Sequence, residues 1–140
     1  MFYNTSYRNK SIYREIDGHL GESYGLIKTF QLRGKGSGRM LIEEMSQKLF
    51  DSLDGHAGMH FTNIEQRPKG VLLFFKRNTS EFTWAVPFHH LSVFKTNTYN
   101  IHAQGQYVKL RLSTVFPYNE KFLKRMMKFR NDYMGLGICG

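Results

Sequence analysis

VLLFFKRNTSEFTWAVPF, residues 71–88, decides the fold, because it reads as two strands joined by a turn. The wholly apolar run at 71–75 is typical of a buried strand. The polar residues 76–80 predict a turn, and apolar side chains alternate through 81–88. We expect three side chains of this second strand to face inward, namely Phe82, Trp84 and Val86.

Short strands of the same kind are expected on both sides of this hairpin, over residues 57–113. Pro87 places the end of its strand at an edge or a bulge, because proline cannot donate to the ladder. Residues 98–113 predict a hairpin that turns at QGQ, with Ile101 and Ala103 facing the returning strand. The sequence therefore predicts a run of antiparallel strands.

After Pro117 the apolar period changes from two to 3.6, which predicts a C-terminal helix over 117–134. Asn119 is expected as its N-cap, and Gly135 lies beyond its end. The apolar side of this helix consists of Phe122, Leu123, Met126, Met127, Phe129, Tyr133 and Met134, and we expect Phe122, Met126 and Met127 to be buried. Its basic stripe consists of Lys121, Lys124, Arg125 and Lys128, for which a solvated helix exterior is the favoured interpretation.

The first part of the chain has a different organisation. Residues 1–23 predict an irregular lead-in or an edge strand, and 24–32 predict a strand. A glycine turn follows, and then 39–55 predict a helix from apolar residues at 41, 42, 45, 49 and 53, although RMLIEE alone could also start a strand. Residues 135–140 are expected to be a flexible tail. The whole of 1–140 is thus expected to be one α+β domain, with a strand–helix extension before the antiparallel sheet.

Composition limits the classes of function. The 140 residues suffice for one core, and 41% of them are hydrophobic. Twenty basic and 11 acidic residues give a net charge of +9, which favours an anionic ligand, a protein partner, a membrane surface or, less strongly, nucleic acid. The one cysteine, Cys139, excludes a disulfide within the monomer, and no apolar signal segment is evident. We therefore expect a cytoplasmic protein.

Residues 70 to about 134 are similar to a bacterial pleckstrin-homology-like (PH-like) domain. The resemblance rests on TWAVPFHHLSVF, where a strand with an aromatic residue and a proline leads into an I/L-x-V segment, and on the hairpin and amphipathic helix that follow. It implies an open antiparallel barrel capped by the C-terminal helix. It also implies a binding or scaffolding module and not an enzyme. Together with the net charge of +9, it favours an anionic ligand such as a protein segment or a lipid headgroup, and we expect no cofactor.

A second, local resemblance concerns the glycine turn. RGKGSGRMLIEEM, residues 33–45, resembles the acyl-CoA pyrophosphate loop of N-acetyltransferases, which implies an acetyl-CoA-dependent enzyme as the alternative function, with the backbone of 34–39 on the pyrophosphate. The segment lacks the Gly-Lys-Ser/Thr end of a P-loop and the third glycine of a dinucleotide fingerprint. No base, nucleophile and oxyanion donor share a context elsewhere, so we expect no catalysis.

The candidate binding residues lie in this basic turn, because its glycines would leave backbone donors free for an anion. They are Arg33, Gly34, Lys35, Gly36, Gly38 and Arg39. An RNA-binding sheet is a further alternative, with Tyr99, Tyr107, Phe74 and Phe75 as stacking side chains beside Lys109 and Arg111. The histidines, including His56 and His60, show no convincing metal-ligand spacing, and no metal site is expected.

Overall fold

The apolar run at 71–75 lies in strand β4, which pairs with β5 at the centre of one half of the sheet. The computed structural model describes residues 2–5, 9–25, 35–52, 60–77, 80–115 and 119–135. Its elements are β1 (Phe2–Asn4), α1 (Lys10–Leu20), β2 (Met40–Met45), α3 (Gln47–Ser52), β3 (His60–Arg67), β4 (Gly70–Arg77), β5 (Ser80–Pro87), η1 (Phe88–His90), β6 (Ser92–Lys95), β7 (Thr98–Ala103), β8 (Gln106–Arg111), α4 (Leu112–Val115) and α5 (Glu120–Tyr133).

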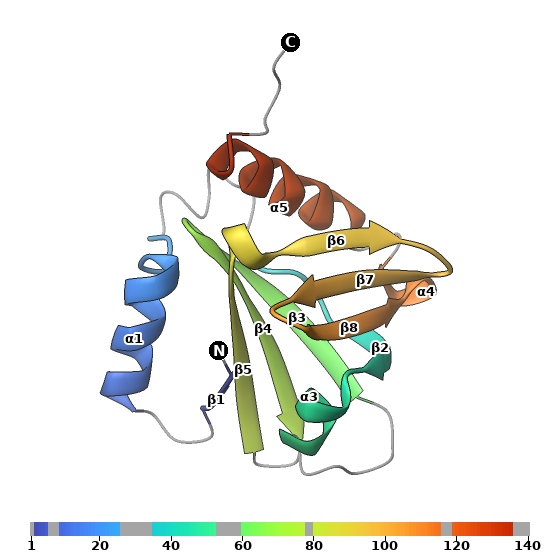
Figure 1. The fold of residues 1–140 in the computed structure, drawn as a ribbon, viewed down its shortest axis with the longest axis horizontal. Coiled ribbons are helices and arrows are strands. Elements are labelled where there is room, and N and C mark those ends of the chain that lie inside the picture. Colours follow the sequence, from blue (N-terminus) through green and yellow to red (C-terminus); the bar gives the residue numbers. More distant parts are fainter. Residues whose placement is uncertain are drawn as a thin grey trace.

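The strands form one open, eight-stranded sheet in the order β1-β5-β4-β3-β2-β8-β7-β6. Every pairing is antiparallel, which confirms the predicted α+β class. The sheet consists of two meanders, β3–β4–β5 and β6–β7–β8, and β2 joins them. In Figure 1 the strands of the first meander run across the direction of those of the second, so the sheet bends at β2.

Both faces of β4 and β5 are covered, and this explains the uninterrupted apolar run. Val71 and Leu73 belong to the main core, which lies on the concave side of the sheet. Leu72 and Ala85 belong to a second, smaller core on the other face, beneath α1. A strand that is covered on both faces has no position for a solvated side chain, so it cannot alternate between apolar and polar residues.

Helix α5 lies across one end of the main core (Figure 1). Phe122 and Met126 are buried as predicted, whereas Met127 is only half-buried. The helix ends at Tyr133, one residue before the predicted end, and Gly135 lies beyond it as predicted; its φ of 72° is a left-handed conformation that glycine adopts without strain. Asn119 precedes the helix as predicted, but its side chain makes no capping hydrogen bond.

The prediction of an irregular lead-in is wrong for residues 10–20, which form helix α1. The side chain of Asn9 caps this helix, since its Oδ1 accepts from the backbone N–H groups of Ser11 (2.9 Å) and Ile12 (3.4 Å). Ile16 and Leu20 lie one turn apart on the face that packs on the sheet. The predicted edge strand does exist as β1, which pairs with β5 at the end of the sheet.

Arg67, at the end of β3, connects α1 to the sheet through ion pairs and a hydrogen bond. Its Nη1 lies 2.9 Å from Asp17 Oδ1 and donates to the Gly21 carbonyl at 2.9 Å, and its Nε lies 2.7 Å from Glu65 Oε2. The Arg67 side chain is only 8% exposed, so these partners compensate a charge that has lost most of its water.

The predicted helix over 39–55 is wrong in its first half, which forms β2, and right at Gln47–Ser52, which forms α3. Met40 and Ile42 face the main core, as alternate residues of a strand do. Leu41 between them is also buried, and its backbone N–H donates to Thr114 Oγ1 of α4, which lies near β2, at 3.0 Å. A register shift after Ile42 then disturbs the alternation further, so the spacing resembles that of a helix.

The hairpin predicted at QGQ is confirmed. Gln104 and Gly105 have φ values of 51° and 81°, as the two central residues of a tight hairpin turn require. Ile101 pairs with Val108 on the buried face. Most of the predicted strand at 24–32, residues 26–32, lies outside the described residues, as do residues 53–55 and most of the tail.

We predict that Met126→Ala lowers the free energy of unfolding by about 2–5 kcal/mol, because it leaves a cavity under α5. Met127→Ala is the matched control on the same helix, and its cost should be clearly smaller because that side chain is half-buried. Urea denaturation measures both values. Equal losses for the two variants would contradict the described orientation of α5.

A second prediction concerns Gly70, where α1 approaches the sheet most closely. A Cβ atom there would lie 2.3 Å from the Val86 carbonyl oxygen and 2.6 Å from Leu20 Cδ2. Gly70→Ala should therefore cost about 1–3 kcal/mol, through displacement of the backbone and of α1. The control is Gly18→Ala within α1, where a Cβ would meet no atom within 4 Å; it should stabilise the protein by about 0.5–1 kcal/mol. Thermal denaturation should show opposite shifts.

Candidate functional site

The glycine-rich segment that the sequence suggests as an anion site is described over residues 35–39, which lie beside β3. Arg33 and Gly34 fall outside the described residues. The Lys35 ammonium lies 3.5 Å from Glu65 Oε1, and Gly36 forms an isolated antiparallel bridge with Glu65. The segment thus continues the sheet locally instead of standing away from it as an open loop.

Two backbone donors of this segment, those of Ser37 and Gly38, are occupied within the chain. Ser37 N–H donates to the Ile64 carbonyl at 2.8 Å, and its hydroxyl oxygen accepts from Ile64 N–H at 2.9 Å. Gly38 N–H donates to Asn119 Oδ1 at 2.7 Å. The expectation that the turn leaves its donors free is therefore wrong for Ser37 and Gly38. The Asn119 side chain was expected to cap α5, and it holds this segment instead.

The two described basic side chains of the segment, Lys35 and Arg39, have different partners. The guanidinium of Arg39 lies 4.1 Å from the centroid of the Phe61 ring, in a cation–π contact. Lys35 is half-buried beside Glu65. Anion binding here would rest on these two side chains, and it stays a prediction.

The four aromatic residues considered as an RNA-stacking surface do not share a face. Tyr99 and Phe75 are buried in the main core, and burial raises the pKa of the Tyr99 hydroxyl. Phe74 packs against the smaller core beneath α1. Only Tyr107 reaches the outer face of β8, where its hydroxyl contacts Glu44.

A different set of rings meets Tyr107 on that face. The ring of His102 on β7 lies 5.4 Å from that of Tyr107, and the ring of Phe94 on β6 lies 4.8 Å from that of His102. We call Phe94, His102 and Tyr107 the aromatic row. Phe94 ends the row and is 48% exposed. Period-two alternation could have identified His102, because the buried Ile101 and Ala103 flank it.

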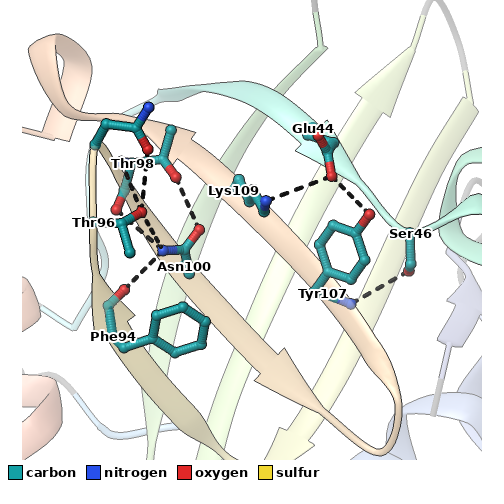
Figure 2. A network of polar contacts seen from close by, with 9 residues as sticks. Glu44, Ser46, Phe94, Thr96, Thr98, Asn100, Tyr107 and Lys109 are labelled. Carbon is teal, nitrogen blue, oxygen red and sulfur yellow. Dashed lines mark hydrogen bonds and ion pairs between the residues drawn. The ribbon is translucent and has the colours of Figure 1, made fainter.

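Charged side chains accompany the aromatic row on β2 and β8 (Figure 2). The Tyr107 hydroxyl donates to Glu44 Oε2 at 2.7 Å, and Lys109 Nζ lies 3.7 Å from the same oxygen. The hydrogen bond from Tyr107 and, to a lesser degree, the charge of Lys109 lower the pKa of the Glu44 carboxyl. The same hydrogen bond raises the pKa of Tyr107. Arg111 forms a further ion pair with Glu43.

Asn100 fixes the turn that leads from β6 to β7. Its buried amide nitrogen donates to the carbonyls of Phe94 and Thr98, both at 3.2 Å, and to Thr96 Oγ1 at 3.1 Å (Figure 2). Its oxygen accepts from the Thr98 hydroxyl at 2.9 Å. A buried amide with this many partners strongly restricts the turn, and therefore the position of Phe94.

Strand β6 ends the sheet. It pairs with β7 on one side, and no other strand of the described residues pairs with its outer edge. Arg130 of α5 donates from Nε to the Leu91 carbonyl at 3.2 Å, which anchors α5 at the start of β6. The aromatic row therefore ends at an edge strand whose position is fixed from both ends, by Asn100 and by Arg130.

The described residues contain no group of three or more histidine, cysteine, aspartate and glutamate side chains suited to a metal ion. No helix in these segments is long and apolar enough to cross a bilayer.

The chain matches no protein-family model, and neither curated proteins nor solved structures show a detectable match to it.

We predict that Tyr107→Phe raises the pKa of the Glu44 carboxyl toward its ordinary value, because the variant removes the hydrogen bond that contributes most to the lowered pKa. Lys109→Gln is the control and should raise it less. In the wild type, any stability that this carboxylate contributes is present above its unfolded pKa and is lost as the pH falls through the folded pKa. Carboxyl-detected NMR over a pH series measures the pKa directly. A larger shift in Lys109→Gln would contradict the described geometry.

Proposed function

We propose that this protein is a non-enzymatic binding module of PH-like type that binds an extended, acidic protein segment along β6. The observation that carries the proposal is the edge of β6, which pairs with no other described strand and bears the exposed Phe94 at the end of the aromatic row. An edge strand presents backbone donors and acceptors that a further strand can use.

The order of the elements supports the PH-like interpretation. Strands β2 to β8 occur in the order β5-β4-β3-β2-β8-β7-β6, as two antiparallel meanders that meet at β2. A single long helix, α5, follows them and packs across the end of the main core (Figure 1). These features agree with an open antiparallel barrel and a C-terminal capping helix. Helix α1 and strand β1 are additions at the N-terminal side.

The charge of the chain favours an acidic occupant. The net charge is +9, and Lys121, Lys124 and Lys128 are exposed on α5, although Lys124 pairs with Glu120 at 2.9 Å. Steering by a basic surface raises the association rate of an acidic partner. If the bound peptide pairs with β6 as a further strand, one of its side chains would lie beside Phe94. The contact between that side chain and the Phe94 ring would add apolar burial at the edge of the sheet.

The acyl-CoA alternative has lost much of its support, because two amides that would hold a pyrophosphate donate within the chain instead. We expect acetyl-CoA to leave the melting temperature unchanged. A large, saturable rise would contradict the non-enzymatic proposal.

The test uses a short synthetic peptide of alternating valine and glutamate, which is extended and acidic. The same peptide with lysine in place of glutamate is its matched control. We expect only the acidic peptide to bind at low salt, and the amide NMR signals of residues 92–95 should shift on binding. Perturbation of other strands alone would count against the proposal.

Variants then test the contact. Phe94→Glu should weaken binding of the acidic peptide about tenfold or more, because it removes the exposed ring and adds a like charge. Tyr13→Glu replaces an aromatic residue of similar exposure on α1 and should leave the affinity unchanged. Anionic vesicles and single-stranded RNA serve as competing ligands. If either binds tightly while the acidic peptide does not, the protein-segment proposal is wrong.

A further inference from the structure

A cavity of about 490 Å³ lies where the β7–β8 turn approaches β5 across the concave side of the sheet. Its apolar wall consists of Phe2, Leu49, Trp84 and Ala103, contributed by β1, α3, β5 and β7. Leu49, Trp84 and Ala103 are each less than 5% exposed, so the cavity reaches the main core. It is separate from the outer face, which carries the aromatic row.

The cavity opens to solvent at one side, and its volume is in the range of small-molecule pockets. Pockets that take drug-sized molecules measure roughly 300–1,000 Å³ and are lined by apolar and aromatic side chains with a few polar groups. The cavity fits that description, with two aromatic residues in its wall and polar residues beside them.

The described residues that line the cavity carry one positive charge. Lys48 of α3 is the cation among the described lining residues, and no carboxylate joins them. Gln106 lies in the same lining, and its Oε1 accepts from the Ser46 hydroxyl at 2.7 Å. With its oxygen occupied in this way, the amide of Gln106 has its N–H₂ group left to offer a ligand. One cation and one amide donor are suited to an acidic group on an apolar molecule.

We propose that this cavity binds a small amphipathic anion, with an aromatic or aliphatic body against Trp84 and Phe2 and an acidic group at Lys48. The apolar part gains free energy by leaving water, and the acidic group keeps a charged partner. The site is independent of peptide binding at β6.

The chain's one tryptophan makes this site directly observable. The probe is 8-anilinonaphthalene-1-sulfonate, and its matched control is N-phenyl-1-naphthylamine, which has the same rings without the sulfonate. Energy transfer from Trp84 to the probe shows that the probe is bound to the protein, and the variants below locate it. We expect saturable transfer to the sulfonate with one probe per chain, and weaker binding of the neutral compound.

Two variants locate the binding. Lys48→Gln should weaken binding of the sulfonate about tenfold and leave the neutral compound unaffected, because only the charged contact is lost. Ala103→Leu narrows the cavity and should weaken both probes, with the melting temperature measured to confirm that the variant is folded. Lys121→Gln removes the same charge on α5 and is the control. Phe94→Glu should leave probe binding unchanged, which separates this site from the one at β6.

Three results would overturn the proposal. They are equal affinities of the two probes for the wild type, an unchanged affinity of Lys48→Gln for the sulfonate, and sulfonate binding without energy transfer from Trp84. The first two would show that no acidic group is held at Lys48, and the third would place the probe far from Trp84.

Discussion

The pairing of β4 with β5 is the contact on which the rest of the structure depends. It runs without interruption from Gly70 opposite Pro87 to Arg77 opposite Ser80. Because its two faces serve two different cores, this pair holds both the curved half of the sheet and α1 in place. The same pairing explains the glycine at position 70, the first residue of β4. A side chain there would collide with Leu20 of α1 and with the backbone of Val86 in β5. The packing of α1 on the sheet also explains the ion pairs of Arg67 at the end of β3. Its buried guanidinium contacts Asp17 of α1 and Glu65 of β3.

The second half of the sheet differs in that only one of its faces is covered, and the proposed peptide site lies at its edge strand, β6. Strands β6, β7 and β8 are covered on the concave side, and their other face holds half-buried and exposed side chains such as Phe94, His102 and Lys109. An antiparallel sheet with one solvated face shows clean alternation. Charged and aromatic residues can therefore gather on that face without cost to the core. In the first half of the sheet, α1 covers the corresponding face of β4 and β5 at Leu72 and Ala85.

How far the sequence predicts this structure depends on how local each signal is. The antiparallel strands and α5 were predictable, because period two, period 3.6 and a terminal Gly135 are properties of neighbouring residues. Helix α1 was missed although Asn9 and the spacing of Ile12, Ile16 and Leu20 provide a cap and an apolar face. The extent of β2 was not predictable, because three successive residues, Met40, Leu41 and Ile42, are buried and the register shifts after Ile42, so the strand does not alternate. The aromatic row depends on the register of three strands, and Phe94 comes to lie beside His102 only when β6 pairs with β7.

A local motif also takes its meaning from distant partners, and the glycine segment shows this clearly. Its amides would suit an anion in isolation, but Asn119 reaches Gly38 from the start of α5 and Ile64 engages Ser37 from β3. Polar contacts of this kind join the two candidate sites as well. Ser46, just after β2, donates its hydroxyl to Gln106 at the cavity and accepts from the Tyr107 N–H at 3.3 Å, at the foot of the aromatic row. A molecule that moved Gln106 would disturb a hydroxyl whose other partner is the backbone of Tyr107. Ser46 thus has polar contacts to both regions, and neither of these contacts involves Phe94 or the edge of β6, where the peptide is proposed to bind.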